Sequence, residues 1–187
     1  SDTLLTPGAL AELLDFAGAR PRCGMVGPKL VHPDGSLQPS CRNFPAPWTH
    51  FLEASGLWQR LRNRRAVGRY YAICSPHDEA VTVDWLTGAC LLVRADVFAR
   101  TGGYDELRFG GMYGEDIDWC RRIHAGGWQI WFDPAAVIVH AESASPLDGR
   151  TVQMYRGFYR YCALHLPRGR QRAMRAATWL ALGPRWL

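Results

Sequence analysis

The sequence predicts a mixed α/β fold followed by a basic helical tail. Apolar residues recur at helical spacing from Leu10 to Ala17, and short apolar runs such as Cys90 to Val93 are typical of buried strands. The composition changes after Asp148, the last acidic residue, because arginine and aromatic side chains are interleaved from there on. We therefore divide the chain into an α/β region, residues 1–148, and a helical tail, residues 149–187.

The bulk composition is that of a globular protein. The chain has 187 residues, 48% hydrophobic and 21% charged, so a core can form. Its net charge of +5 favours anionic partners such as nucleotide diphosphates, lipid phosphates or a membrane surface. The six cysteines lack zinc-type spacing, which indicates reduced thiols in a cytosolic compartment. No apolar run reaches the ~18 residues of a membrane-spanning helix.

The first part of the chain is expected to form a helix, a strand and a loop. Thr6 precedes a proline and is expected to cap a helix that ends near Gly18. Residues 23–31 have the composition of a short buried strand that is interrupted at Gly27. Residues 37–47 contain three prolines and little periodicity, so a loop is expected there.

Two features of the first part suit contact with anions. The guanidinium of Arg42 could hold a phosphate, although we prefer an ordinary exposed arginine. Residues 48–67 mix arginine with tryptophan and leucine, which fits a membrane-surface helix and equally an ordinary surface helix. Gly56 argues against one long helix in this segment.

The second part is expected to alternate between strands and helices. Residues 81–85 alternate as a strand does, and residues 90–93 are expected to form a buried strand. Residues 128–132 and 136–139 are expected to be two strands around a turn. The Pro-Arg-Gly sequence at 167–169 is expected to split the tail into two helices.

Three carboxylates follow a glycine-rich segment. Glu115, Asp116 and Asp118 open a helix that is expected to run from Asp116 to Ala125. One acid would suffice to cap this helix, so three indicate chemistry as well. Like charges this close raise the pKa of one of them, which suits a general base. Arg122 either pairs with Asp118 or contacts a phosphate.

Several motifs in a fixed order resemble a known family. They are Asp84-Trp85-Leu86-Thr87-Gly88-Ala89-Cys90-Leu91-Leu92-Val93-Arg94, Gly102-Gly103-Tyr104-Asp105-Glu106, Glu115-Asp116-Ile117-Asp118 with Arg122, Gly127-Trp128, Pro134 and His140. Together they resemble the second half of a family 2 glycosyltransferase of the GT-A fold, in particular bacterial rhamnosyltransferase-like members, from Ser1 to about Ser145. The resemblance implies the C-terminal portion of a GT-A-type mixed sheet flanked by helices. The missing initiator Met and glycine-rich nucleotide-binding unit lead us to expect a fragment.

The resemblance also implies a function. It implies an inverting enzyme that moves a sugar from a nucleotide-sugar donor to an acceptor hydroxyl of a cell-envelope glycan or glycolipid, with rhamnosyl transfer as the default. The expected location is the cytoplasm, with peripheral contact at the inner face of the cell membrane left open. The resemblance further implies a divalent metal, Mg²⁺ or Mn²⁺.

The site residues are assigned by this resemblance. Asp116 is the expected general base, and Glu115 is expected to orient it or the acceptor. Asp2 and His140 are the expected metal ligands, since neutral imidazole is a good ligand for manganese-type ions. The acceptor sugar is expected against the turn formed by Trp85, Thr87, Gly88 and Ala89.

Other functions are weighed against this one. A glycoside hydrolase also uses two carboxylates, but these would flank a cleft rather than share one helical turn. A non-catalytic fragment or module that contacts anionic lipid or glycan would explain the basic, aromatic tail. Nucleic acid is not expected, because no nucleic-acid-binding motif accompanies the mixture of arginine and aromatic residues.

Overall fold

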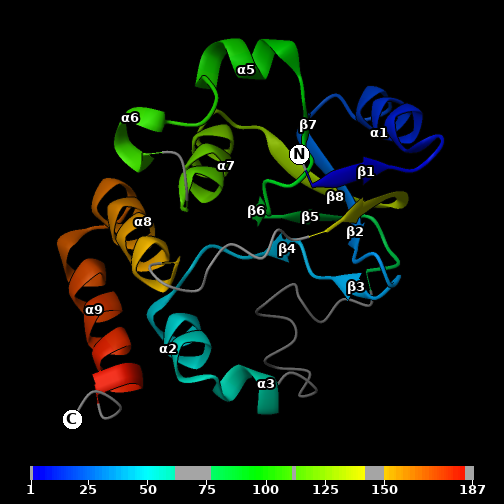
Figure 1. Cartoon of the computed structure of the whole chain (residues 1–187). Helices are drawn as coiled ribbons and strands as arrows, with labels where there is room; N and C mark the ends of the chain where they lie inside the picture. Colours follow the sequence, from blue (N-terminus) through cyan, green and yellow to red (C-terminus); the bar gives the residue numbers. More distant parts are fainter. Residues whose placement is uncertain (1, 62–76, 111–112, 142–149, 184–187) are drawn as a thin grey trace.

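The computed structural model describes residues 2–61, 77–110, 113–141 and 150–183, and it confirms the predicted mixed α/β class. Within these residues, six strands form one sheet in the order β1-β8-β2-β3, with β5 added on β8 and β7 on β2 (Figure 1). The strands are β1 (Thr3–Leu5), β2 (Cys23–Val31), β3 (Leu37–Gln38), β5 (Val81–Val83), β7 (Leu92–Val93) and β8 (Gln129–His140). A separate ladder pairs β4 (Cys41–Arg42) with β6 (Trp85–Leu86).

The centre of the sheet is the parallel pair of β2 and β8. Two expectations about these strands are wrong. β2 continues through Gly27 without interruption, and β8 is a single strand where two strands around a turn were expected. The register shifts between Pro28 and Lys29, opposite the Asp133–Val137 stretch of β8. A bulge therefore absorbs the irregular residues without ending either strand.

Helices cover both faces of the sheet (Figure 1). They are α1 (Ala9–Gly18), α2 (Pro47–Ser55), α3 (Leu57–Leu61), α5 (Ala95–Thr101), α6 (Glu106–Phe109), α7 (Glu115–Ala125), α8 (Arg150–His165) and α9 (Arg168–Leu182). Alternate residues of β2 serve the two faces: Met25 packs in the cluster with Ile123 of α7, and Val26 packs in the cluster with Leu13 of α1. The sheet thus holds α7, and the acids at its start, in a fixed place.

Several local predictions can be compared with these elements. Gly56, at φ 74, separates α2 from α3 and confirms the expected break; residues 62–67 of that segment lie outside the described residues. Thr6 does not cap α1, because the N-cap is Gly8 and the Thr6 hydroxyl donates instead to the Val137 carbonyl at 2.6 Å. The strand expected at residues 90–93 is shorter, Leu92–Val93.

The tail folds onto the rest of the molecule. It forms two helices, α8 and α9, as predicted. Tyr161 and Met174 of these helices are fully buried in one cluster with Phe109 and Ile117. The proposed division between residues 148 and 149 lies outside the described residues. In the part of the chain that the structure describes, no helix is long and apolar enough to cross a membrane.

Candidate active site

The acid-bearing helix α7 begins at a glycine turn. Gly114 is its N-cap residue at φ 93, a conformation that side chains rarely adopt, and its carbonyl accepts the Asp118 amide at 3.0 Å. The helix starts at Glu115, one residue earlier than predicted. All three carboxylates lie in the first turn, where the partial positive charge of the helix end favours them.

Asp116 has the properties of a general base. Its Oδ1 accepts the Ile117 amide at 2.8 Å, and the Gly88 amide also donates to this carboxylate. Burial, with a smaller contribution from the neighbouring charge of Glu115, raises the pKa of Asp116 to about 6. The predicted rise is therefore present, but desolvation is its main cause. A carboxylate with this pKa is ionised at neutral pH and still binds a proton well.

Glu115 lies beside the base with one oxygen unused. Its Oε2 is buried and has no hydrogen-bond partner within the described residues. Burial raises the pKa of Glu115, while backbone hydrogen bonds at Glu115 and Tyr113 oppose the rise. A buried oxygen without a donor is costly, so a hydroxyl from a bound molecule would relieve it.

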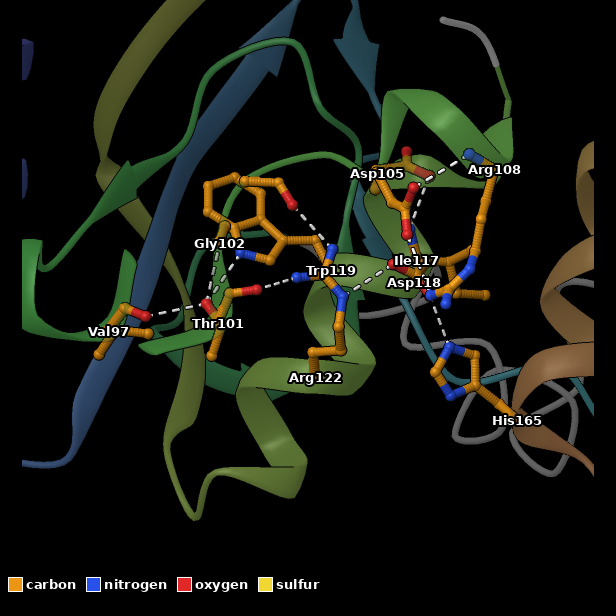
Figure 2. Close-up of polar contacts among 12 residues, drawn as sticks. Val97, Thr101, Gly102, Asp105, Arg108, Ile117, Asp118, Trp119, Arg122 and His165 are labelled. Atoms are coloured by element: carbon orange, nitrogen blue, oxygen red, sulfur yellow. Dashed lines mark hydrogen bonds and ion pairs between the residues drawn. The ribbon is translucent and has the colours of Figure 1, made fainter. Parts of the chain in front are cut away.

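Asp118, the third acid, has a structural environment. It is 2% exposed, and its two oxygens contact His165 Nε2 at 2.6 Å and Arg122 Nε at 2.9 Å (Figure 2). The Arg122 guanidinium also donates to the carbonyls of Thr101 and, at 2.7 Å, of Gly103. Of the two roles considered for Arg122, the structure shows the pairing with Asp118. The pair fixes the glycine loop before α7 and ties α8 to α7.

The expected acceptor turn lies against Asp116. The amide of Thr87 donates to the Ser40 carbonyl at 3.1 Å. A Cβ at Gly88 would lie 2.6 Å from the Tyr104 hydroxyl and 3.7 Å from Asp116 Cβ, so only glycine fits between them. Trp85 donates its indole N–H to the Asn43 carbonyl at 3.0 Å, and the partly buried Ala89 packs against the core.

Asp2 and His140 meet at the edge of the sheet. Thr3 of β1 pairs with His140 of β8, which brings His140 Nε2 to 3.4 Å from Asp2 Oδ2. His140 Nδ1 lies 2.8 Å from Gln38 Oε1. Because that oxygen only accepts, Nδ1 donates to it, and Nε2 is the ring nitrogen that faces the Asp2 carboxylate.

The residues present fit a hard divalent cation. One carboxylate and one neutral imidazole are suitable ligands for Mn²⁺ or Mg²⁺. No group of three or more histidine, cysteine or acidic side chains that could hold a metal occurs in the described part of the chain. The remaining ligands would therefore come from water and from a bound diphosphate.

A line of contacts joins this pair to the base. Gln38 contacts His140, the carbonyl of Ser40 two residues further on accepts the Thr87 amide, and the neighbouring Gly88 amide donates to Asp116. The segment from β3 to β4 thus links the pair of Asp2 and His140 to the Gly88 turn and Asp116, as expected if they belong to one site.

Comparison with known proteins decides the family. The model of the family described as "Glycosyltransferase like family 2" matches residues 1–160. The chain belongs to this family. Its mixed sheet flanked by helices agrees with the GT-A type expected of a family 2 glycosyltransferase.

Two relatives of this chain are named as rhamnosyltransferases and a third as an O-antigen biosynthesis protein. The chain is 36% identical over 141 residues to N-acetylglucosaminyl-diphospho-decaprenol L-rhamnosyltransferase of Mycobacterium tuberculosis (strain H37Rv), covering 74% of this chain and 44% of the relative. It is 41% identical over 58 residues to rhamnosyltransferase WbbL of Escherichia coli K12, covering 31% and 21%. It is 34% identical over 146 residues to O-antigen biosynthesis protein RfbC of Myxococcus xanthus, covering 76% and 10%. The chain spans less than half the length of these relatives.

Sequence reasoning missed three residues of this candidate site. Tyr104 was noted only as part of a motif, yet its hydroxyl occupies the space that a Cβ at Gly88 would need. Gln38 orients His140 across the sheet, and His165 reaches Asp118 from the tail. The Gln38–His140 and His165–Asp118 contacts join residues far apart in the chain, so no local sequence pattern predicts them. Arg42, which we preferred as an exposed arginine, is only one-third exposed and lies near the Trp85 ring, 5.8 Å from its centroid.

Proposed function

We propose that the full-length protein transfers a sugar, with inversion, from a nucleotide-sugar donor to an acceptor hydroxyl. The observation that carries this proposal is Asp116, a carboxylate with a raised pKa placed beside the exposed Gly88 turn in a family 2 chain. The names of the relatives support rhamnose as the sugar and a lipid-linked glycan of the cell envelope as the acceptor. Donors of this class support a cytoplasmic reaction.

The chain's own residues suit one side of an in-line displacement. Asp116 would accept the proton of the acceptor hydroxyl as its oxygen attacks the anomeric carbon. The unpaired Oε2 of Glu115 would accept a hydrogen bond from the same sugar and hold it in the attacking orientation. The acceptor would lie against a surface formed by Trp85, Thr87, Gly88 and Ala89. A single attack opposite the leaving group inverts the anomeric centre.

Asp2 and His140 would hold the divalent cation. When bound, the cation would neutralise charge on the departing diphosphate. Gln38 would keep His140 in the tautomer that offers Nε2. The carboxylate of Asp2 would hold the cation by its charge and would tolerate partial exposure to water.

A transfer assay tests the proposal. The full-length protein is given a labelled nucleotide-activated rhamnose and a lipid-linked acceptor, and the linkage of the product is determined by NMR. We expect transfer with inversion and its loss in Asp116→Asn, while Asp15→Asn, which changes an exposed carboxylate of α1, retains it. Near-normal turnover by Asp116→Asn would refute the assignment of the base. Donor hydrolysis without transfer would favour a hydrolase.

The exposed face of α9 supports contact with an anionic membrane surface. Arg168, Arg170, Arg172 and Arg175 are exposed, and Trp179 is 69% exposed. Flotation with vesicles that contain anionic lipid tests this part. Binding at low salt that is lost when the four arginines are changed to glutamine is expected. No flotation at low salt would refute it, and flotation without any transfer activity would favour the non-catalytic binding module.

A further inference from the structure

An apolar pocket of about 340 Å³ lies between α2 and α8. Its size is within the range of small-molecule sites. Ala54 of α2 and Met154, Tyr155 and Phe158 of α8 line it, together with Phe44 from the loop before α2. Such walls favour a hydrocarbon ligand, because burying apolar surface is the main contribution they can make.

The polar side chains of this pocket are mostly engaged with the protein. Thr49 Oγ1 donates to the Ala46 carbonyl at 2.9 Å, and His50 Nε2 contacts Thr178 Oγ1 at 2.7 Å. The backbone carbonyl of Asn43 also accepts a hydrogen bond from the Trp85 indole. A sugar or a nucleotide base would need many hydrogen-bond partners, and this lining offers few.

Arg42 is the exception at the edge of the pocket. Its Nε is buried and has no hydrogen-bond acceptor within the described residues. Its contact with Glu53 is loose, at 3.7 Å between Nη1 and Oε1. A guanidinium with an unused, buried N–H suits a phosphate, whose oxygens accept from two donors at once.

The pocket is bounded by residues that are close in sequence to those of the candidate active site. Ile117 and Trp85 both line it; Ile117 directly follows the base Asp116, and Trp85 precedes the Gly88 turn. A molecule whose chain fills the pocket and whose phosphate meets Arg42 would therefore present its sugar on the side where Asp116 lies.

We propose that this pocket binds the first isoprenoid units of a lipid phosphate, with Arg42 on the phosphate. The proposal deepens the transferase function and rests on it for the ligand's role as acceptor. An apolar chamber near the base, with the guanidinium of Arg42 at its edge held only loosely by Glu53, complements an amphiphile that carries a phosphate between its hydrocarbon chain and its sugar. Recognition of the lipid end would also place the acceptor hydroxyl consistently at Asp116.

Binding can be measured without turnover. Isothermal titration of the full-length protein uses geranyl phosphate, with geraniol and inorganic phosphate as separate halves of the probe. We expect geranyl phosphate to bind about tenfold or more tightly than either half, because chain and phosphate each contribute. Ala54→Phe, which fills the pocket, should abolish this preference, whereas Ala163→Phe at an exposed position of α8 should keep it. Equal binding by Ala54→Phe and the wild type would overturn the proposal.

The role of Arg42 has its own control. Arg42→Gln should weaken geranyl phosphate about tenfold and leave geraniol unchanged, as expected for the loss of a charged hydrogen bond. Glu53→Gln removes the same ion pair but keeps the guanidinium, so it should bind geranyl phosphate at least as well as the wild type. Similar losses in both variants would show that Arg42 acts only as a partner of Glu53 and would overturn its phosphate role.

Transfer assays then separate this proposal from the function itself. In the full-length protein, Ala54→Phe should lower the ratio of kcat/KM for a prenyl-phosphate-linked acceptor to that for the lipid-free sugar. An unchanged ratio would overturn the lipid site even if transfer occurs. Failure of the wild type to transfer to either acceptor, with geranyl phosphate still bound, would refute the proposed function and retain the pocket as a lipid-phosphate site.

Discussion

At the scale of single residues, Glu115, Asp116 and Asp118 of α7 lie in different environments and therefore have different roles. The sequence predicts that the helix begins with acidic residues. It does not show which acid is the base and which is structural, because that depends on what surrounds each side chain. Asp118 turns to Arg122 and His165, whereas Asp116 faces the Gly88 turn. One feature of the prediction, a raised pKa on Asp116, is confirmed, although burial rather than the neighbouring charge is its larger cause.

The raised pKa of Asp116 predicts a pH dependence of the reaction. A base works only when it is deprotonated, so kcat/KM should rise with pH and fall about tenfold per unit below pH about 6. Initial rates from pH 5 to 8 check this, with circular dichroism at each pH as the control for folding. A flat profile across this range would contradict the role of Asp116.

The same pKa predicts an effect on stability. The folded-state pKa of Asp116 lies above its ordinary value of 3.8. At high pH the ionised carboxylate is therefore less favourable in the folded state than in the unfolded chain, and it lowers the free energy of unfolding. Asp116→Asn should therefore raise the free energy of unfolding at pH 8 by about 1 kcal/mol, less than the full shift implies because the group is partly exposed. At about pH 3 the carboxyl group is largely protonated in both the folded and the unfolded chain, so the difference should nearly vanish. Urea titrations at the two pH values measure it; an Asn variant less stable at pH 8 would contradict it.

At the scale of elements, the helix α8 acts as a support for α7. Gly157 of α8 lies against the turn at Tyr113 and Gly114, and a Cβ at Gly157 would overlap the Tyr113 carbonyl oxygen. Eight residues further along α8, His165 holds Asp118. Sequence patterns predicted both helices of the tail, but the only role they indicated for it was contact with anionic lipid or glycan. The support for the acids depends on close packing between distant residues, which no periodicity encodes.

Replacing Gly157 tests this support. Gly157→Ala should destabilise the fold by about 2 kcal/mol, because the backbone of Tyr113 and Gly114 leaves no room for a methyl group, and should also lower kcat by displacing Glu115 and Asp116. Gly169→Ala, in α9 with nothing near its Cβ, is the matched control and should be neutral or slightly stabilising. Thermal unfolding and initial rates give both readouts. Equal behaviour of the two variants would show that α8 does not position the acids.

At the scale of the whole molecule, one edge of the sheet gathers residues from both ends of the α/β region. The antiparallel pairing of β1 with β8 places Asp2 beside His140, which the sequence could suggest only through family resemblance. The fold class was predictable because helical and strand periodicities are strong. The order of the strands was not, and the Asp133-Pro134 sequence resembled a turn although the bulge keeps it within β8.

The pair at this edge predicts a dependence on metal. If the proposed metal site is used, excess EDTA should stop transfer and Mn²⁺ or Mg²⁺ should restore it, because a bound cation would neutralise charge on a departing diphosphate. Binding of Mn²⁺, followed by electron paramagnetic resonance without substrate, should weaken in His140→Ala, while His32→Ala, which changes a histidine of a surface turn, should leave it unchanged. Full activity in EDTA would contradict the metal role.

The parallel pairing of β2 with β8 has a consequence for how the protein is made. Cys23 lies opposite Gln129, so β2 leaves the ribosome long before its partner has been synthesised. Until then β2 lacks its longest strand pairing, and Ile130 and Phe132 of β8 are absent from the cluster around Met25, so the nascent chain is a natural client for a chaperone. A chain truncated after Ala125, which lacks β8 altogether, should therefore aggregate when it is expressed.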